Sequence, residues 1–319
     1  MTDSPVLSVV IPAMNEEENV QAMHDRLVAA LEPAAVSFEM IWIDDGSSDA
    51  TWQLISQLAA RDERVRGLSF SRNFGHQAAV TAGVDAARGD AVAIIDADLQ
   101  DPPEVIPEMI EKWREGYQVV YGQREQRDGE TVFKRATSAA FYRTLKALAH
   151  IEIPLDTGDF RLMGPKALAA FRAMPEHNRF VRGMVSWIGF PQAPVRFHRH
   201  ARTRGETKYP LKTMLKLAIS GFTSFSFVPL RAATWLGLIV CLFSVGYPIL
   251  RLVLSLAGVV GFGSAGLVSA IFFLGGVQLL AIGALGEYIA RLFEEAVQRP
   301  LYLVKEHTDG GKRVTPPER

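Results

Sequence analysis

The chain lacks several common functional signatures. It has one cysteine, Cys241, so no disulfide can form within it, which fits a reducing compartment. Its 34 Lys and Arg residues nearly balance 35 Asp and Glu residues, and this lacks the basic excess typical of nucleic-acid-binding proteins. No Walker-type phosphate loop occurs, and the N-terminus has neither the basic start nor the apolar core of a signal peptide. We therefore expect no nucleic-acid partner and no cleaved leader.

Formal charge is also missing from a long stretch near the C-terminus. Between Ala232 and Gly286 the only charged residue is Arg251. A bilayer crossing needs about 20 apolar residues, so this stretch predicts two membrane helices, at about 232–256 and 266–289. The alternative is a buried helical core, which the length of the charge-free stretch disfavours. Basic residues flank the pair and are absent from its connector, so the positive-inside rule predicts that the preceding domain and both termini are cytoplasmic.

Basic residues cluster just before the apolar stretch, between Arg196 and Lys216. Such clusters attract anionic lipid headgroups with about 1 kcal/mol per basic residue. Within 210–230, apolar residues interleave with Lys212 and Lys216, which predicts an amphipathic helix lying in the membrane interface. An ordinary packed surface helix is the alternative for this segment.

The first half of the chain alternates short apolar runs with helical periodicity. Such alternation predicts βαβ units and a mostly parallel sheet, whose ligands bind at the carboxyl ends of the strands. The expected strands are 7–11, 38–43, 65–69, 91–95 and 119–121, and the expected helices are 16–31, 51–60, 75–87 and 104–114.

Polar clusters follow three of these expected strands. Pro12–Glu16, Asp44–Ser47 and Asp96–Gln100 each begin where an apolar run stops. Asp96 and Asp98 are two residues apart on an extended chain, so both point to the same side, and hard carboxylate oxygens suit Mg²⁺ or Mn²⁺. An isolated Asp-x-Asp is more often a solvated turn. The convergence of three clusters on one sheet edge favours a metal and phosphate site instead.

Together, the segments 9–17, 43–49 and 96–103 resemble family 2 glycosyltransferases with the GT-A fold. Within that family they resemble the polyprenyl-phosphate sugar transferases, the group of dolichyl-phosphate mannose synthase and the bactoprenol glucosyltransferases. The resemblance continues through 156–163, 202–209 and the apolar segments. It implies an α/β, Rossmann-like GT-A domain over 1–209, an amphipathic helix at 210–230, a two-helix transmembrane region at 231–291 and a cytoplasmic tail at 292–319.

The resemblance also implies a nucleotide pocket and a metal site. The nucleotide pocket maps onto Pro12, Asn15, Glu16, Asp45 and Gly75, with Asp44 as the alternative to Asp45 for accepting an N–H of the base. A tight turn also explains Asp44 and Asp45. The metal site maps onto Asp98 as the direct ligand, Asp96 nearer the ribose or behind the ligands, and Gln100.

The remaining implied residues handle phosphate and catalysis. Arg124 follows the fifth strand, next to the expected diphosphate. The acceptor phosphate maps onto Arg135, Ser138, Arg202 and Lys208.

Asp159 is the candidate catalytic carboxylate together with Asp98, and Asp156 is an alternative. A phosphate monoester is mostly dianionic at pH 7, so Asp159 can act as a base or only orient the acceptor. An ion pair between Asp159 and Arg161 is the structural alternative.

These features predict inverting transfer of a hexose, first of all glucose from UDP-glucose, to a polyprenyl phosphate at the cytoplasmic membrane. Alternatives are a GDP-mannose-dependent synthase and a non-catalytic protein that binds or translocates lipid phosphates. A processive synthase is disfavoured because Gln-x-x-Arg-Trp is absent. Glycines between Gly275 and Gly286 permit close helix contacts, so we expect a homo-oligomer.

Overall fold

The computed structural model describes residues 5–124, 157–198, 265–310 and 312–314, with a few single positions between 235 and 257. The chain forms two units. The first combines Met1–Pro210 with Arg299–Arg319, and the second is Leu211–Gln298. The predicted amphipathic helix 210–230 and nearly all of the predicted helix 232–256 lie outside the described residues.

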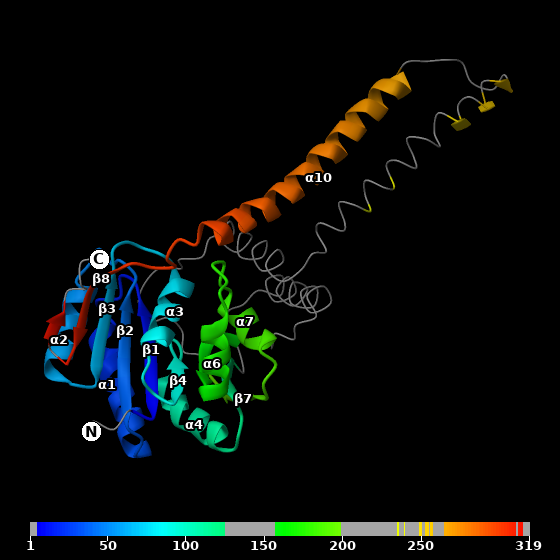
Figure 1. The fold of residues 1–319 in the computed structure, drawn as a ribbon. Helices are drawn as coiled ribbons and strands as arrows, with labels where there is room; N and C mark the ends of the chain where they lie inside the picture. The colour runs from blue at the N-terminus through cyan, green and yellow to red at the C-terminus, as the bar shows by residue number, and fades with distance from the viewer. Residues whose placement is uncertain are drawn as a thin grey trace. The chain divides into compact units, whose positions relative to one another are not determined.

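The first unit is built on a nine-stranded sheet with the order β7-β5-β6-β4-β1-β2-β3-β8-β9 (Figure 1). The four central strands β4, β1, β2 and β3 run parallel, as predicted, while β6 and β8 pair antiparallel on either side of them. The strands are β1 (Leu7–Ala13), β2 (Phe38–Asp44), β3 (Val65–Phe70), β4 (Ala91–Ile94), β5 (Val119–Arg124), β6 (Thr157–Met163), β7 (Gln192–Phe197), β8 (Val304–Asp309) and β9 (Lys312–Val314).

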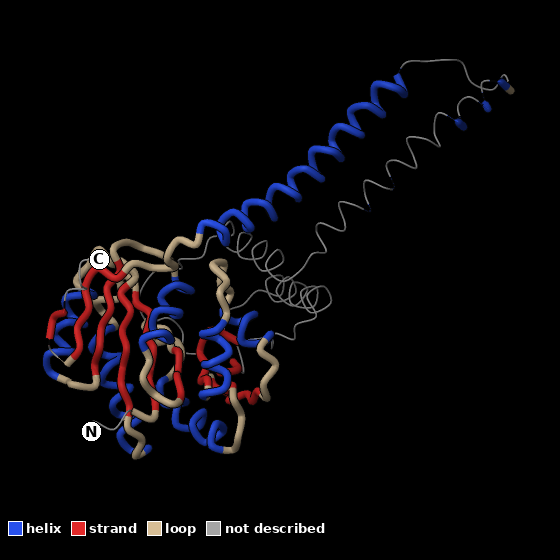
Figure 2. The backbone as a smooth tube through the Cα atoms, in the orientation of Figure 1, coloured by secondary structure: helices blue, strands red, loops and turns tan. Residues whose placement is uncertain are grey.

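Helices cover both faces of this sheet (Figure 2). Buried residues of α1, α2 and α4 join one core with Leu7, Val9 and Ile11 of β1, and α3 packs on the other face against Ile41 and Ile43 of β2. The helices are α1 (Val20–Leu31), α2 (Thr51–Arg61), α3 (His76–Ala86), α4 (Ile106–Arg114), α6 (Pro165–Ala173) and α7 (Val181–Trp187), with short 3₁₀ turns η1 (Glu32–Ala34) and η2 (Pro103–Val105).

The expected strands and helices of this part all form, with ends that differ by up to four residues, and two of these differences have a clear cause. The strand expected to stop at Ile11 continues to Ala13. The Val10 carbonyl accepts the Ile95 N–H, and the Ala13 carbonyl accepts the Asp45 N–H. Because successive residues of a strand alternate sides, Pro12 directs its missing donor away from β2 and breaks no bond of that ladder.

The first helix starts at Val20 rather than at Glu16. The Glu16 N–H donates to Thr51 Oγ1 at 2.9 Å, and Asn15 exchanges hydrogen bonds with the loop after β2. These long-range bonds hold the backbone before Val20 in a turn, although the acidic residues there favour a helix start.

The C-terminal segment closes one edge of the sheet. Figure 1 shows β8, in red, beside β3, and the register pairs Arg66 with Asp309. Tyr302 stacks on Phe70 with ring centroids 5.1 Å apart, and Trp52 donates to Glu306 at 3.1 Å. Part of the segment 292–319, expected to be a tail, therefore belongs to the first unit.

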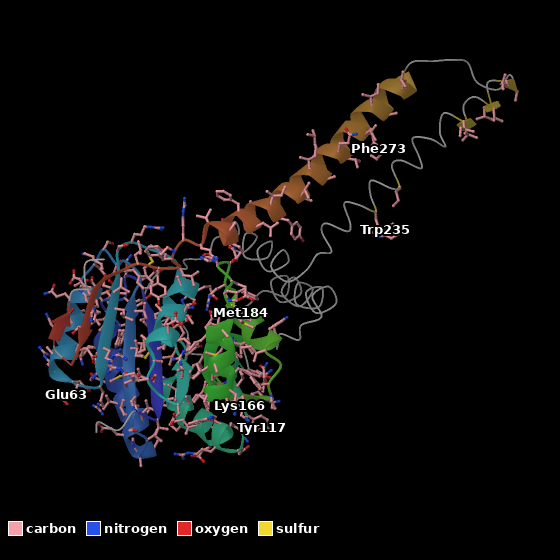
Figure 3. All side chains as sticks on the ribbon, viewed as in Figure 1. Glu63, Tyr117, Lys166, Met184, Trp235 and Phe273 are labelled. Carbon is pink, nitrogen blue, oxygen red and sulfur yellow. The ribbon has the colours of Figure 1, made fainter. Side chains whose placement is uncertain are left out.

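The described part of the second unit is dominated by α10 (Ala265–Val297), 33 residues long. Within it, Phe273–Val297 is long and apolar enough to cross a membrane, the one such helix among the described residues. Most of the large apolar side chains described on it are exposed, Phe273 by 60% (Figure 3). The helix predicted at 266–289 thus forms as part of a longer one.

The packing of α3 on β1 gives a stability prediction. A Cβ at Gly83 would collide with the Val10 side chain. We expect Gly83→Ala to lower the free energy of unfolding by about 1–3 kcal/mol, because forcing atoms into a closed contact costs that much. The measurement is thermal unfolding of the purified full chain. Val10→Ala in the same background should restore part of the loss, and an unchanged unfolding temperature in the single variant would contradict the packing.

Candidate active site

The ends of β1 and β2 are joined by their loops. The Asn15 N–H donates to Ser47 Oγ at 2.9 Å, and the Ser48 N–H donates to Asn15 Oδ1 at 2.8 Å. Asn15 has a left-handed backbone (φ 52°), a conformation that asparagine tolerates better than most residues. The structure therefore brings the first two predicted polar clusters together, with Asn15 and Glu16 acting as ties between them.

Asp44 is a buried residue that stabilises a turn. Its Oδ2 accepts the Ser69 hydroxyl at 2.8 Å, and its Oδ1 accepts the Ser47 N–H at 3.1 Å. Both oxygens thus have protein partners, which agrees with the turn interpretation of this residue.

Asp45 anchors the start of α3. Its carboxylate accepts the Phe74 N–H at 2.7 Å and the Gly75 N–H at 3.0 Å. Burial raises the pKa of Asp45, although these two backbone donors act against the rise. Gly75 itself has φ +98°, a conformation that strains any side chain. The predicted pocket residues Asp45 and Gly75 therefore touch each other.

The third cluster follows β4. Asp98 Oδ1 accepts the Gln100 N–H at 3.1 Å, and Leu99 between them has φ +59°, a strained conformation for leucine. The Asp96 side chain is 31% exposed, yet its Oδ1 is buried and makes no hydrogen bond to the described residues. Burial, opposed by His76 and helped by neighbouring carboxylates, raises the pKa of Asp96 to about 6.

Asp159 lies on β6 with its side chain 5% exposed. Arg182 forms a bidentate ion pair with it: Nε lies 2.8 Å from Oδ1 and Nη2 lies 3.2 Å from Oδ2. Although burial opposes ionisation, Arg182 and His76 hold the pKa of Asp159 well below its usual range. Asp159 is therefore a carboxylate that is permanently ionised at neutral pH.

His76 connects the two carboxylate clusters. Its Nε2 lies 3.1 Å from Asp159 Oδ2 and 3.6 Å from Asp96 Oδ1. Burial alone would lower the pKa of His76, but the charge of Asp96 and the hydrogen bond to Asp159 raise it to about 9. The imidazole is thus a cation at neutral pH, placed between two acids.

The expected alternative for Asp159, an ion pair with Arg161, is wrong. The Arg161 guanidinium donates to the backbone carbonyls of Gly158 at 2.9 Å and Asp159 at 3.3 Å. On a strand, residues two apart share a side, but here Arg182 occupies the carboxylate.

Arg124 ends β5 beside the same site. Its Nη2 lies 3.5 Å from Asp101 Oδ1 and so close to Gly158 that a Cβ there would touch it. Asp101 is 1% exposed and Arg124 10% exposed. The arginine predicted to bind phosphate therefore lies next to the loop that carries Asp98.

Several predicted residues lie outside the described part of the chain. They are Arg135, Ser138, Asp156, Arg202 and Lys208. Conversely, sequence reasoning missed His76 and Arg182. His76 directly follows the predicted pocket residue Gly75, whereas Arg182 has no local signal because its partner is 23 positions away.

The carboxylates fit a divalent cation that also binds substrate. Among the described residues no three His, Cys, Asp or Glu side chains are grouped to hold a metal ion. A cation on Asp96 or Asp98 would draw its other ligands from phosphate oxygens and water, the usual pattern for Mg²⁺. The buried Asp96 oxygen without a hydrogen bond suits such a ligand role.

Comparison with known proteins gives consistent matches. Residues 8–171 match the family model described as glycosyl transferase family 2. The chain is 46% identical over 302 residues to the uncharacterized glycosyltransferase YkcC of Bacillus subtilis, covering 94% of this chain and 93% of that protein. It is 40% identical over 302 residues to a prophage bactoprenol glucosyl transferase homolog of Escherichia coli, covering 94% and 98%.

A solved structure shares the fold. Mycobacterium tuberculosis glucosyl-3-phosphoglycerate synthase superposes with a TM-score of 0.50 at 22% identity, covering 70% of this chain and 81% of that one. At this identity the likeness concerns the fold alone.

The Asp45 anchor gives a prediction for the site. Asp45→Asn replaces one acceptor oxygen with an NH₂ donor and removes the charge, so it should weaken the hydrogen bonds to the Phe74 and Gly75 N–H groups. A hydrogen bond to a charged group contributes about 1.5–3 kcal/mol, and we expect the free energy of unfolding to fall by up to that amount. Chemical denaturation of the full chain measures it, with the exposed Asp90→Asn as the matched control. Equal midpoints for the two variants would contradict the anchor.

Proposed function

The chain belongs to glycosyl transferase family 2, which makes it a glycosyltransferase, and from this premise we propose that it transfers glucose from UDP-glucose to a polyprenyl phosphate. The transfer inverts the anomeric carbon and takes place at the cytoplasmic face of a membrane. GDP-mannose is the alternative donor. The family membership confirms the resemblance expected from the strand-end motifs.

One observation carries the proposal: Asp96 and Asp98 lie at the tip of β4, and the ionised Asp159 is joined to Asp96 through His76. This arrangement places an acid pair that can bind a cation, Asp96 and Asp98, near the ionised Asp159. The acid pair suits a diphosphate leaving group, and Asp159 suits a reaction centre that gains positive charge.

The donor would lie along the ends of β1, β2 and β4. Asp45, Asn15 and Glu16 would border the nucleoside end, and Asp98 and Asp96 would hold Mg²⁺ or Mn²⁺, with Gln100 nearby. A bound cation neutralises the diphosphate charge and acts as a Lewis acid. Arg124, next to Asp101, supplies further positive charge for phosphate.

The reaction needs little proton transfer from the protein. A phosphate monoester has its second pKa near 6, so the acceptor is mostly dianionic at pH 7. One of its oxygens attacks the anomeric carbon, and the bond from that carbon to the diphosphate oxygen breaks. The nucleoside diphosphate departs, and the sugar is left on the lipid phosphate with inverted configuration.

Two lines of support favour a lipid acceptor. Relatives that are 40% identical over nearly their whole length are named bactoprenol glucosyl transferases. In addition, Phe273–Val297 has the length and composition of a membrane span. We assign the acceptor phosphate to Arg135, Ser138, Arg202 and Lys208, and we retain two spans, cytoplasmic termini and a homo-oligomer as parts of the proposal.

Reconstitution tests this function directly. Purified full chain in detergent, given UDP-glucose, Mg²⁺ and undecaprenyl phosphate, should produce lipid-linked glucose. GDP-mannose in place of UDP-glucose separates the two donors. Absence of transfer from any UDP- or GDP-hexose, with lipid phosphate still bound, would contradict the proposal and favour a non-catalytic lipid-phosphate-binding protein.

The metal site gives a matched prediction. Asp98→Asn should lower the transfer rate by at least about 100-fold, because changing even a residue behind a metal ligand costs 10–100-fold. Chelation by EDTA should abolish transfer, and added Mg²⁺ or Mn²⁺ should restore it. The exposed Glu108→Gln on α4 removes the same charge and should behave as wild type. An Asp98→Asn enzyme with an unchanged rate would exclude the assigned role.

A further inference from the structure

Three elements meet at the Asp159 carboxylate. Asp159 belongs to β6, His76 is the first residue of α3, and Arg182 lies in the first turn of α7. Polar atoms of His76 and of Arg182 each lie within 3.2 Å of the Asp159 carboxylate oxygens. A buried acid with two basic partners from separate helices is a site built by tertiary structure.

The partners use most of the acceptor capacity of Asp159. Oδ1 accepts Arg182 Nε, while Oδ2 accepts Arg182 Nη2 and contacts His76 Nε2. A carboxylate has about four lone-pair sites, so the contacts with the described residues leave about one, on Oδ1. Because a guanidinium stays charged at any accessible pH, protonation of Asp159 would remove its ion pair with a permanent cation.

The residues next to the two basic residues are also joined by a hydrogen bond. The Val181 N–H donates to Gln77 Oε1 at 2.8 Å. Val181 precedes Arg182 and Gln77 follows His76, so this bond fixes the starts of α7 and α3 beside the carboxylate. The Asp159 carboxylate is thereby held by two side chains whose helix starts are joined to each other.

We propose that Arg182, with His76, is a positioning residue that keeps Asp159 as a fixed hydrogen-bond acceptor for the substrates and not as a proton acceptor. This inference rests on the proposed function and names which role of Asp159 that function uses. The remaining Oδ1 site would accept a hydroxyl of the donor hexose. The acceptor phosphate, already ionised, would supply its own nucleophilic oxygen.

A purely structural role makes different predictions. If Arg182 only compensated a buried charge, its replacement would lower stability and leave turnover per folded enzyme unchanged. If Asp159 were a base, weakening Arg182 would make the carboxylate a stronger proton acceptor, and kcat would hold or rise.

The experiment is a double-mutant cycle on the full chain in the glucosyl transfer assay. Arg182→Lys keeps the positive charge but cannot form the bidentate pair of hydrogen bonds with Asp159. We expect its kcat to fall about 10- to 100-fold, because small misplacement of a reacting group has that effect. KM for the donor should stay within about twofold. Asp159→Asn should lower kcat at least as much, and the double variant should be no worse than Asp159→Asn alone.

Arg172→Lys is the structural control. Arg172 ties α6 to the carbonyls of Val84 and Ala87, away from the carboxylates. We expect this variant to lose thermal stability while its kcat and KM remain those of the wild type.

Each other outcome has a definite meaning. Unchanged or raised kcat in Arg182→Lys, or losses that add in the double variant, would overturn the inference while wild-type transfer upheld the proposed function. If the wild-type enzyme transferred no sugar, that result would contradict the proposed function and this inference as well.

Discussion

Repulsion among gathered carboxylates is the constraint on which this site depends. Asp96 interacts electrostatically with Asp98, Asp101 and Asp159, so four acids share one edge of the sheet. Two like charges 4 Å apart repel by roughly 4 kcal/mol at the dielectric typical of a protein surface. The antiparallel pairing of β6 with β4 creates this crowding, since it places Asp159, near the start of β6, beside the loop that follows β4. To remain stable, the fold must place positively charged groups near these carboxylates.

The fold supplies them unevenly. Arg182 and His76 are committed to Asp159, and Arg124 lies against Asp101. Among the described residues, Asp96 receives only the longer contact to His76, and burial together with the neighbouring carboxylates raises its pKa. The protein thus compensates Asp159 from within and leaves the tip of β4 suited to an added cation. This division explains how neighbouring acids can serve different roles at one site.

Sequence reasoning reached the architecture and part of the site for physical reasons. Alternating apolar runs identified the parallel centre, and strand-end polarity identified Asp45, Asp96 and Asp98. It did not find Arg182, because the choice of Asp159 over other acids is made by the packing of α7 and not by spacing. It placed the first helix too early, since the bonds from Asn15 and Glu16 to a distant loop outweigh local helix preference. It missed β8, whose residues Val304–Asp309 are mostly polar and show no buried-strand pattern.

The central claim is that the acids at the tip of β4 need an added cation in order to hold a nucleoside diphosphate. Calorimetric titration of UDP into the purified full chain, with Mn²⁺ and then with EDTA, tests it most directly. The account predicts that chelation weakens binding by at least about tenfold, by analogy with losses seen when metal sites are perturbed. Equal dissociation constants in the two conditions would contradict it.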